Sequence, residues 1–406
     1  MSISNSELTQ LAETYGAPLY VYDSEKIISQ YHALTNAFDG MNLKLKYASK
    51  ACTNLSVLKL LRKLGSGMDC VSVNEVQMGL QAGFKKEDII FTPNCVDFKE
   101  IEEAKGIGVH INIDNIPFLE QFGKKYGNSY PICIRINPHI QAGGNANIQV
   151  GHVGSKFGIS ILQFKEIVAV VEKYNLLVEG LHVHTGSDIL DTDVFLKGAN
   201  VLFECAQEFK DLRFLDFGSG FKVPYKEGDP STDYKKLGVK MKAAFTAFCA
   251  DYGRELEIWF EPGKFMVSES GNFVVQTNVV KPTPACVFAG VNSGFNHLIR
   301  PMFYDSFHQI NNISNPDGEK KIYNIVGYIC ETDTFAVDRE LSEVRVGDYL
   351  VFKNAGAYGF EMGSNFNSRL RPAQVMWHKG EGHLIRKRDE FEDLMRNQTG
   401  FEPELD

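Results

Sequence analysis

Eight short apolar runs, spaced regularly between residues 25 and 270, constrain the fold of this 406-residue chain more than any other feature. The runs are Leu43–Ser49, Met68–Ser72, Ile89–Pro93, Val109–Ile113, Ile132–Asn137, Val178–Thr185, Phe214–Phe217 and Ile258–Glu261. Longer amphipathic stretches separate them, and one of these places Leu237, Met241, Ala244 and Phe248 on one face of a predicted helix, at steps of four, three and four residues. Eight strand–helix units over about 245 residues match the size of a closed parallel (β/α)8 barrel. We therefore expect an α/β fold of this kind.

An open, doubly wound parallel sheet would show the same alternation of strands and helices. Such sheets usually carry a GxGxxG turn after their first strand. No turn of that kind follows Ser49, where the first run ends. The barrel is therefore the favoured reading.

Beyond residue 270 the helical period fades and a second, β-rich domain is expected, of barrel or sandwich type. Its strands are predicted at Asn272–Lys281, Ala285–Val291, Lys321–Cys330 and Asp348–Lys353. The early segment Pro18–Tyr22 also has a strand pattern and could pair with them. We thus assign residues 25–270 to the barrel and residues 1–24 plus 271–406 to the β-rich domain, with a charged, peripheral tail from Glu381.

Charge and cysteine usage exclude several classes of protein. The net charge is −9, from 42 Lys and Arg against 51 Asp and Glu, and no basic tract is present, which argues against nucleic acid or a membrane as partner. No apolar run approaches the roughly 18 residues of a membrane span, and the polar start MSISNSELTQ is unlike an export signal. The eight cysteines show no CxxC pair, so we expect a cytoplasmic protein without a disulfide framework or a cysteine metal site.

Polar residues recur where the predicted barrel strands end, and a (β/α)8 barrel carries its active site at those ends. Taken singly, each has an ordinary structural explanation: Asp69 could cap a helix and Arg135 could form a structural ion pair. Their convergence on one rim argues for a site. The strand-end residues are Lys50, Asp69, Asn94, Arg135, Asn137, His182, His184, Gly218–Gly220 and Glu261–Lys264.

Three of these features together indicate pyridoxal phosphate. Lys50 closes an apolar strand, and a lysine desolvated there could form a Schiff base with a carbonyl compound. The turn Gly218-Ser-Gly220 lets backbone N–H groups approach an anion closely, although a tight turn alone would also explain it. Glu261 would lie across the mouth from Lys50, where a carboxylate at about 4 Å, at an effective dielectric near 20, stabilises a protonated pyridine by about 4 kcal/mol, roughly three pK units.

The chain resembles the fold-type III pyridoxal-phosphate decarboxylases, and within them most closely the diaminopimelate decarboxylases. The likeness runs nearly end to end, from Tyr15-Gly-Ala-Pro-Leu-Tyr-Val-Tyr22 to Arg371-Pro-Ala. Its blocks are Tyr47-Ala-Ser-Lys50, Lys156-Phe-Gly-Ile159, His182-Val-His-Thr-Gly-Ser187, Glu261-Pro-Gly263, Arg300-Pro301 with Tyr304 and His308, Cys330-Glu331, and Gly356-Ala-Tyr-Gly359 with Asn367-Ser-Arg369. Their order and spacing together carry the assignment.

The resemblance implies decarboxylation of meso-2,6-diaminopimelate to L-lysine and CO2, the last step of lysine biosynthesis, by a homodimer that shares its active site across the interface. It implies that Lys50 binds the cofactor as a Schiff base, that His184 stacks on the ring and that Glu261 binds the ring nitrogen. The remaining residues expected to bind the cofactor are Asp69, Arg135, Ser187, Gly218, Ser219, Gly220, Gly263, Lys264 and Tyr358.

The same resemblance assigns the substrate side of the site. Cys330, supplied by the partner subunit, would reprotonate the carbon that loses CO2, although most lone cysteines are inert buried thiols. Glu331 would receive the distal ammonium of the substrate, and Arg300 with Tyr304 would surround its distal carboxylate, while Lys264 and Tyr358 also reach the substrate.

Two departures from the family pattern concern this binding. The glycine-rich phosphate turn carries a side chain at Ser219 and a charge at Lys222, and Lys264 stands where the family has arginine. Lysine offers a point charge instead of a bidentate fork, so Lys264 would hold a carboxylate less directionally, or Arg300 has taken over that contact.

Alternative activities remain at this stage. A related decarboxylase of ornithine, arginine or carboxynorspermidine needs no cation for a distal carboxylate, so Arg300 favours the diacid. A non-catalytic relative would be expected to lack Lys50 or Cys330, and both are present. A racemase of the same barrel type is disfavoured by the Cys330-Glu331 and Asn367-Ser-Arg369 blocks. Ile140–Gly154, rich in Gly and Asn, is a candidate mobile loop over the site.

Overall fold

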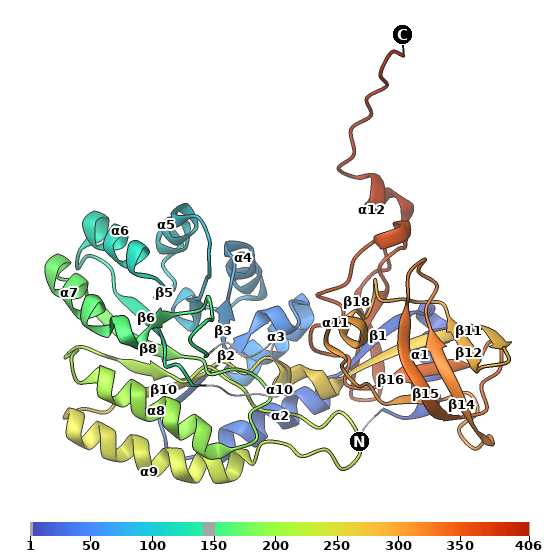
Figure 1. Ribbon diagram of the computed structural model, residues 1–406, viewed down its shortest axis with the longest axis horizontal. Coiled ribbons are helices and arrows are strands. Elements are labelled where there is room, and N and C mark those ends of the chain that lie inside the picture. Colours follow the sequence, from blue (N-terminus) through green and yellow to red (C-terminus); the bar gives the residue numbers. More distant parts are fainter. Residues whose placement is uncertain (1–2, 141–150, 406) are drawn as a thin grey trace. The chain divides into compact units, whose positions relative to one another are not determined.

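The structure, a computed structural model, describes residues 3–140 and 151–405 (Figure 1). The chain separates into two compact units, one of residues 26–267 and the other of residues 1–25 with 268–406. Residues 141–150, the centre of the expected mobile loop Ile140–Gly154, lie outside the described residues. Among the helices that the structure describes, none combines the length and the apolar character needed to cross a membrane.

The first unit is a closed barrel of parallel strands. In order around the barrel, the described strands are β2 (Leu43–Ala48), β3 (Gly67–Cys70), β4 (Ile89–Phe91), β5 (His110–Ile113), β6 (Ile132–Asn137), β8 (Val178–Val183), β9 (Phe214–Asp216) and β10 (Glu257–Phe260). Pairing of Ile258 in β10 with Leu43 in β2 closes the ring, and the short β7 (Ile159–Ser160) pairs with the end of β6. The predicted (β/α)8 barrel is therefore confirmed, and the open doubly wound sheet is excluded.

Helices surround the barrel on the outside (Figure 1). They are α2 (Ser24–Ala37), α3 (Leu55–Leu64), α4 (Val73–Ala82), α5 (Phe98–Ile107), α6 (Ile116–Tyr126), α7 (Phe164–Tyr174), α8 (Thr192–Ala206), α9 (Tyr234–Tyr252) and the short α10 (Lys264–Val267). Polar residues cap the helix starts: Asn54 accepts from Ser56 N, and Ser72 accepts from Glu75 N. Because these caps fix the turns between strand and helix, they also fix the residues at the strand ends.

The barrel interior below the strand ends is filled. Ile90, Cys133, Phe214 and Trp259 form a buried cluster, in which the Phe214 and Trp259 rings stack with centroids 3.5 Å apart. Lys46 also points inward: its ammonium lies 4.0 Å from the Trp259 ring centroid and donates to the Asp88 carbonyl. Burial lowers the pKa of Lys46 to about 8. This packed layer provides a floor for the polar residues above it.

The second unit is a mixed β-sheet. It contains β1 (Leu19–Asp23), β11 (Gly271–Pro282), β12 (Val287–Val291), β13 (Ile310–Asn312), β14 (Lys320–Val326), β15 (Thr334–Ser342), β16 (Tyr349–Phe352), β17 (Ala373–His378) and β18 (Glu381–Arg386). As the sequence predicted, the early strand joins this sheet: β1 pairs with β11 and with β17. The helix α1 (Asn5–Tyr15) packs Leu8 and Leu11 against the same core.

Two predictions for this unit are wrong. The strand expected to reach Cys330 ends at Val326, because Gly327 turns the chain and its N–H bonds to the Asp333 carbonyl. Cys330 consequently lies on a loop. The tail from Glu381 is not merely peripheral, since β18 forms an antiparallel ladder with β17. Two short helices, α11 (Arg300–Tyr304) and α12 (Phe391–Met395), complete the described unit.

Candidate active site

Lys50 and Asp69 come from neighbouring barrel strands and face each other at the rim. Lys50 lies in the single helical turn Ser49–Ala51 that follows β2, and its Nζ is 3.8 Å from Asp69 Oδ2. The Asp69 side chain is buried, whereas the Lys50 side chain is 46% exposed. The sequence suggested a desolvated lysine, but Lys50 is partly exposed. The reason is that it stands on the turn after the strand and not within the barrel. Its amine is accessible for reaction with a carbonyl compound.

Glu261 follows β10, which pairs with β2, so it stands at the end of the strand next to that of Lys50 and not across the mouth from it as the sequence predicted. It is held beside a histidine. The Asn112 amide donates to His182 Nδ1 at 2.7 Å, so neutral His182 carries its hydrogen on Nε2. That Nε2 lies 3.3 Å from Glu261 Oε2. Burial lowers the pKa of His182, which keeps the imidazole neutral at neutral pH. Asn112 thereby fixes the tautomer of His182, whose Nε2 lies close to Glu261 without forming a hydrogen bond to it.

Three buried carboxyl groups at the rim have very different pKa values. Burial and the negative charge of Glu261 raise the pKa of Asp69 to about 8 and raise the pKa of Asp216 well above its usual range. Burial opposes ionisation of Glu261 as well, but the contact with His182 and the ammonium of Lys50 outweigh it and lower its pKa to about 2. Glu261 is therefore the carboxyl group that is ionised at neutral pH.

The turn after β9 shapes the adjacent side of the rim. Gly218 and Gly220 have φ of +60° and +130°, and a Cβ at Gly218 would lie 2.6 Å from His184 Nδ1. The N–H of Ser219 donates to His184 Nδ1, and the N–H of Gly218 donates to Asp216 Oδ1. The amides of Gly218 and Ser219 thus hold two side chains of the site, and that of Ser219 orients the imidazole of His184.

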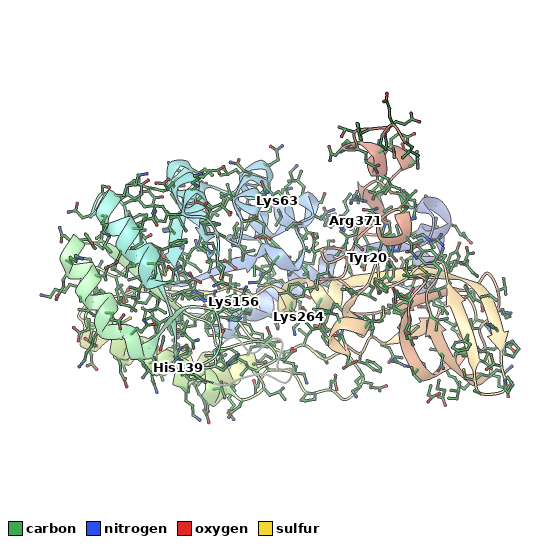
Figure 2. The ribbon with its side chains drawn as sticks, turned by 45° about the horizontal axis from the view of Figure 1, so that its top comes forward. Tyr20, Lys63, His139, Lys156, Lys264 and Arg371 are labelled. Atoms are coloured by element: carbon green, nitrogen blue, oxygen red, sulfur yellow. The ribbon has the colours of Figure 1, made fainter. Side chains whose placement is uncertain are left out.

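Lys264 forms an ion pair that the sequence did not predict. Lys264 is labelled in Figure 2. Its Nζ lies 2.5 Å from Asp188 Oδ1, and both side chains are largely buried. Asp188 follows Ser187 in the loop after β8 and has a φ of +60°. A Cβ at Gly263 would lie 3.1 Å from the Ala48 Cβ, so this part of the chain packs closely on the end of β2. The pair links the β8 loop to the segment that follows β10.

A second group of predicted residues comes together within the β-rich unit. The buried Arg300 begins α11, and its guanidinium carbon lies 5.6 Å from the Tyr304 ring centroid and 5.7 Å from the Tyr358 ring centroid. Tyr358 has a φ of +59°. These aromatic faces align the guanidinium, which can bind a carboxylate through two parallel hydrogen bonds.

Cys330 and Glu331 are exposed and lie on the loop between β14 and β15. Cys330 is thus not an inert buried thiol. The Asn367 amide donates to Cys330 Sγ at 3.0 Å. The predicted residues accordingly form one set in the barrel unit and two sets in the β-rich unit.

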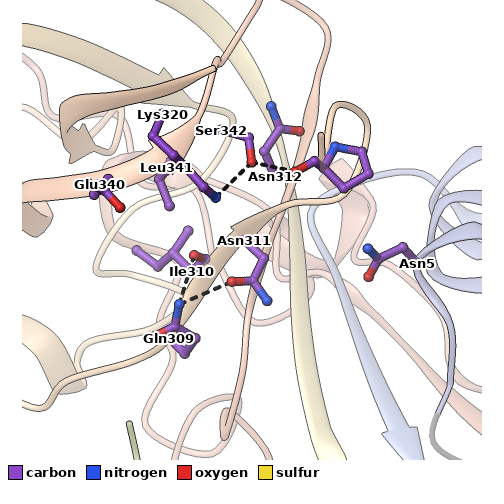
Figure 3. Close-up of a pocket in the computed structure, with 10 residues that line it drawn as sticks. Asn5, Gln309, Ile310, Asn311, Asn312, Lys320, Glu340, Leu341 and Ser342 are labelled. Atoms are coloured by element: carbon purple, nitrogen blue, oxygen red, sulfur yellow. Dashed lines mark hydrogen bonds between the residues drawn. The ribbon is translucent and has the colours of Figure 1, made fainter. Parts of the chain in front are cut away.

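A pocket of about 200 Å³ elsewhere in the β-rich unit contains none of the predicted site residues (Figure 3). It is lined by Asn5, Gln309, Ile310, Asn311, Asn312, Pro316, Lys320, Glu340, Leu341 and Ser342. Lys320 Nζ donates to Ser342 Oγ at 3.2 Å, and Gln309 Nε2 donates to Asn311 Oδ1 at 3.1 Å. These polar groups therefore bond to one another.

The barrel rim fits pyridoxal phosphate better than a metal ion. His182, Asp216 and Glu261 offer ligand atoms within 4.8 Å of one another, a set that can bind a divalent ion. However, a metal would have to displace the protons that Asp216 and His182 Nε2 carry at neutral pH. The buried atoms Asp69 Oδ1, Asp216 Oδ2 and Glu261 Oε1 have no hydrogen-bond partner among the described residues. They can therefore form hydrogen bonds with the N–H and O–H groups of a polar ring.

Sequence reasoning missed four residues of this site. Asn112 and Asp216 lie inside strands β5 and β9, and His182 near the end of β8 was noted but given no role. The available signal was a polar residue within an otherwise apolar run, since such a side chain in a barrel strand must point either into the barrel or outward against a helix. Asp188 had no comparable signal.

Comparisons with known proteins agree with this geometry. A family model described as the pyridoxal binding domain of pyridoxal-dependent decarboxylases matches residues 24–268. A diaminopimelate decarboxylase of Methanothermobacter thermautotrophicus is 35% identical, over 98% of this chain and 95% of its own length, and one of Campylobacter jejuni is 33% identical, over 97% and 98%. The crystal structure of diaminopimelate decarboxylase from Helicobacter pylori complexed with L-lysine has a TM-score of 0.88 and 33% identity, covering 96% of this chain and 98% of that one.

Proposed function

This chain belongs to the pyridoxal-dependent decarboxylase family, and on that premise we propose that it decarboxylates meso-2,6-diaminopimelate to L-lysine and CO2. The observation that carries the chemistry is that an accessible lysine, Lys50, and an ionised buried carboxylate, Glu261, stand at the ends of two neighbouring parallel strands. The likeness over the full length to diaminopimelate decarboxylases supports this choice of substrate. The reaction is that of a carboxy-lyase at the last step of lysine biosynthesis.

The cofactor is pyridoxal phosphate, which when bound supplies a protonated ring that accepts the electron pair released as CO2 leaves. Lys50 would hold it covalently through its side-chain amine. Glu261 would accept a hydrogen bond from the ring nitrogen and keep it protonated, and His184 would lie against the ring as a neutral imidazole. The lowered pKa of His184, caused by burial and by the neighbouring Arg135, suits that role.

The other cofactor contacts are assigned by position on the rim. The glycines of this turn are required by close packing, because a Cβ at Gly218 would lie 2.6 Å from His184 Nδ1 and one at Gly220 would lie 2.6 Å from Ile189 Cδ1, and the turn is assigned to the phosphate by its place after a barrel strand. Asp69 is mostly protonated at neutral pH and can donate a hydrogen bond as well as accept one. The proposed contacts are Asp69, Arg135, Ser187, Gly218, Ser219, Gly220, Gly263, Lys264 and Tyr358.

Substrate recognition is assigned to the β-rich unit. Arg300, aligned by Tyr304 and Tyr358, binds the distal carboxylate of the substrate, and Glu331 binds its distal ammonium. Lys264 already pairs with Asp188, which supports Arg300 as the main carboxylate ligand. A decarboxylase of ornithine or arginine would have no distal carboxylate for Arg300 to bind.

The active site is proposed to form between two copies of the chain in the cytoplasm. In this arrangement, Cys330 and Glu331 of one subunit reach the barrel rim of the other, and Cys330 donates a proton to the carbon that has lost CO2. The exposure of both residues on one loop supports an intersubunit role, since exposed groups can be covered by a partner.

Release of CO2 by the purified protein tests the proposal. With pyridoxal phosphate added, we expect turnover of meso-2,6-diaminopimelate and at least about 100-fold lower kcat/KM with ornithine or arginine, as expected where a buried polar group loses its partner. Preferred turnover of either competitor would replace the proposed substrate. Sedimentation and CO2 release, both measured over the same dilution series, would show whether activity is lost as a dimer dissociates.

A further inference from the structure

The loop that carries Cys330 is held at its base by a buried carboxylate. Asp333 accepts hydrogen bonds from Ile329 N at 2.9 Å and from Phe295 N at 2.7 Å, and its carbonyl accepts from Gly327 N. A Cβ at Gly327 would lie 2.0 Å from Asp333 Oδ2, so the chain passes directly against this side chain. Asp333 therefore fixes the base of the loop but does not reach the Cys330 side chain.

A second segment, Phe366–Arg369, fixes the outer part of the loop through side chains. Asn367 Nδ2 lies 3.0 Å from Cys330 Sγ, and the Arg369 guanidinium lies 3.9 Å from the Tyr328 ring centroid, two residues before the cysteine. The Phe366 ring stacks on that of Phe295, with centroids 5.6 Å apart. One short turn thus contacts the cysteine, the residue two positions earlier and a neighbouring loop.

The direction of the hydrogen bond matters for the chemistry of Cys330. The Asn367 amide is the donor, so it uses a lone pair of the sulfur and leaves the S–H hydrogen available for another acceptor. The same N–H remains a donor to the sulfur after that hydrogen has been given away. A partner that accepted the S–H hydrogen would have the opposite effect and would keep it from the substrate.

The backbone at this turn explains why asparagine suits the position. Asn367 has φ of 55° and ψ of 28°, and Ser368 has φ of 53°. Asparagine and aspartate enter this left-handed region more readily than other residues that carry a Cβ. Asn367 therefore combines a permitted backbone conformation with an N–H donor aimed at the sulfur.

We propose that Asn367 is a positioning residue that holds Cys330 Sγ in place for proton delivery, an inference that rests on the function proposed above. In the step concerned, the S–H bond of Cys330 breaks and a C–H bond forms at the carbon that has lost CO2. The electron pair of the new bond is the pair that CO2 left behind, and the resulting thiolate regains its proton from solvent.

The test compares Asn367→Asp with Ser368→Gly. Asn367→Asp keeps the shape and the left-handed backbone but replaces the N–H donor with an acceptor, which attracts the S–H hydrogen. We expect kcat with diaminopimelate to fall about 10-fold, KM to change by less than about 3-fold, and the solvent deuterium isotope effect on kcat to increase. Ser368→Gly alters the same turn without removing the contact and is expected to keep the wild-type kcat.

Alkylation of Cys330 provides a measurement that does not depend on turnover. The reagent is iodoacetamide at pH 7.5, and the product is quantified by mass spectrometry. Asn367→Asp should lower the alkylation rate of Cys330 at least about 3-fold relative to that of the exposed Cys95, because a carboxylate beside the sulfur disfavours the reactive thiolate. If Asn367→Asp folds poorly, Asn367→Gly tests the same loss of kcat with an unstrained backbone.

The outcomes separate two kinds of failure. Wild-type kcat and an unchanged isotope effect in Asn367→Asp, with Cys330→Ala strongly impaired, would overturn the role of Asn367 and leave the proposed function intact. Absence of CO2 release by the wild-type protein, or full activity of Cys330→Ala, would overturn the proposed function or the role of Cys330, and the inference with it.

Discussion

The barrel rim and the loops of the β-rich unit solve the same problem, holding reactive side chains in place, by different means. At the rim, Asp69 and Glu261 stand at the ends of paired strands above a packed layer of apolar residues. In the β-rich unit, Cys330 stands on an exposed loop that is held by Asp333 and by the side chains of Phe366–Arg369. The strand ladders fix the rim groups through the backbone, whereas individual side chains fix the loop groups.

This difference predicts where a substitution acts. Removing a side chain from the rim changes the reactivity or the charge of the site, while the barrel stays folded. Removing a support from the loops leaves the rim intact and displaces the groups it holds.

Lys50→Ala has the largest expected effect. Loss of the amine that binds the cofactor should reduce kcat/KM about 10,000-fold or more and abolish the absorbance band of the covalently bound cofactor. The control is Lys63→Ala, which removes an exposed lysine of α3 and should leave both unchanged (Figure 2). An unaltered band in Lys50→Ala would refute the assignment of the lysine.

Glu261→Gln should reduce kcat about 100- to 1,000-fold. An ionised carboxylate about 4 Å from a ring nitrogen stabilises its protonated form by about 4 kcal/mol at an effective dielectric of 20, and glutamine loses that term. Steady-state kinetics measures the loss, and cofactor titration checks that binding persists. Glu257→Gln is the matched control, because Glu257 lies at the opposite end of the same strand and bonds to Trp259 Nε1. Equal effects of the two substitutions would contradict the assignment.

Asp333→Ala should act on the loops alone. The backbone N–H groups of Phe295 and Ile329 lose their hydrogen-bond acceptor, and the start of the Cys330 loop is no longer held in place. We expect kcat to fall about 10- to 30-fold, since displacement of a reacting group by about 1 Å can cost up to 100-fold. The absorbance band should persist with an unchanged cofactor Kd. Loss of the band together with activity would show that the two regions are not independent in the way proposed.

The sequence predicts the rim better than the loops for a physical reason. Apolar runs mark the barrel strands, and parallel strands bring their carboxyl ends to one rim, so Lys50 and Glu261 could be identified by position. The polar partners Asn112 and Asp216 were passed over because they lie within the runs. Even there, local periodicity misjudged detail: Ala244 was expected on the buried face of α9, whereas Phe245 is buried.

The loops depend on contacts that no local pattern reports. The apolar run through Lys321–Cys330 continues past Val326, yet the strand stops there because Asp333, beyond the run, binds the turning chain. Asn367 and Cys330 are 37 residues apart, and their contact follows from tertiary packing alone. A family resemblance could point to these residues but not to the hydrogen bonds that hold them.

Asp69→Asn should change the pH dependence of stability. The folded pKa of Asp69 is about 8, and the unfolded value is near 4, so between these pH values only the folded chain keeps the proton and its stability falls as pH rises. Asparagine is always neutral and removes that loss. The variant without cofactor should be more stable than wild type by at least about 1 kcal/mol at pH 8 and equal near pH 4, by urea denaturation. Asp251→Asn, at an exposed position of α9, should show no such difference; a variant less stable at pH 8 would contradict the raised pKa.

Substitution of the Lys264–Asp188 pair has the smallest expected effect. It tests whether an ion pair between side chains also holds part of the rim in place. If the pair serves to tie the β8 loop to the segment after β10, Lys264→Met and Asp188→Asn should each weaken cofactor binding about 3- to 10-fold, and the double variant should be no worse than either. If Lys264 instead binds phosphate or substrate directly, Lys264→Met alone should weaken binding, and Asp188→Asn should strengthen it by releasing the ammonium. Fluorescence titration with pyridoxal phosphate distinguishes these patterns, because the sign of the Asp188→Asn effect differs between them.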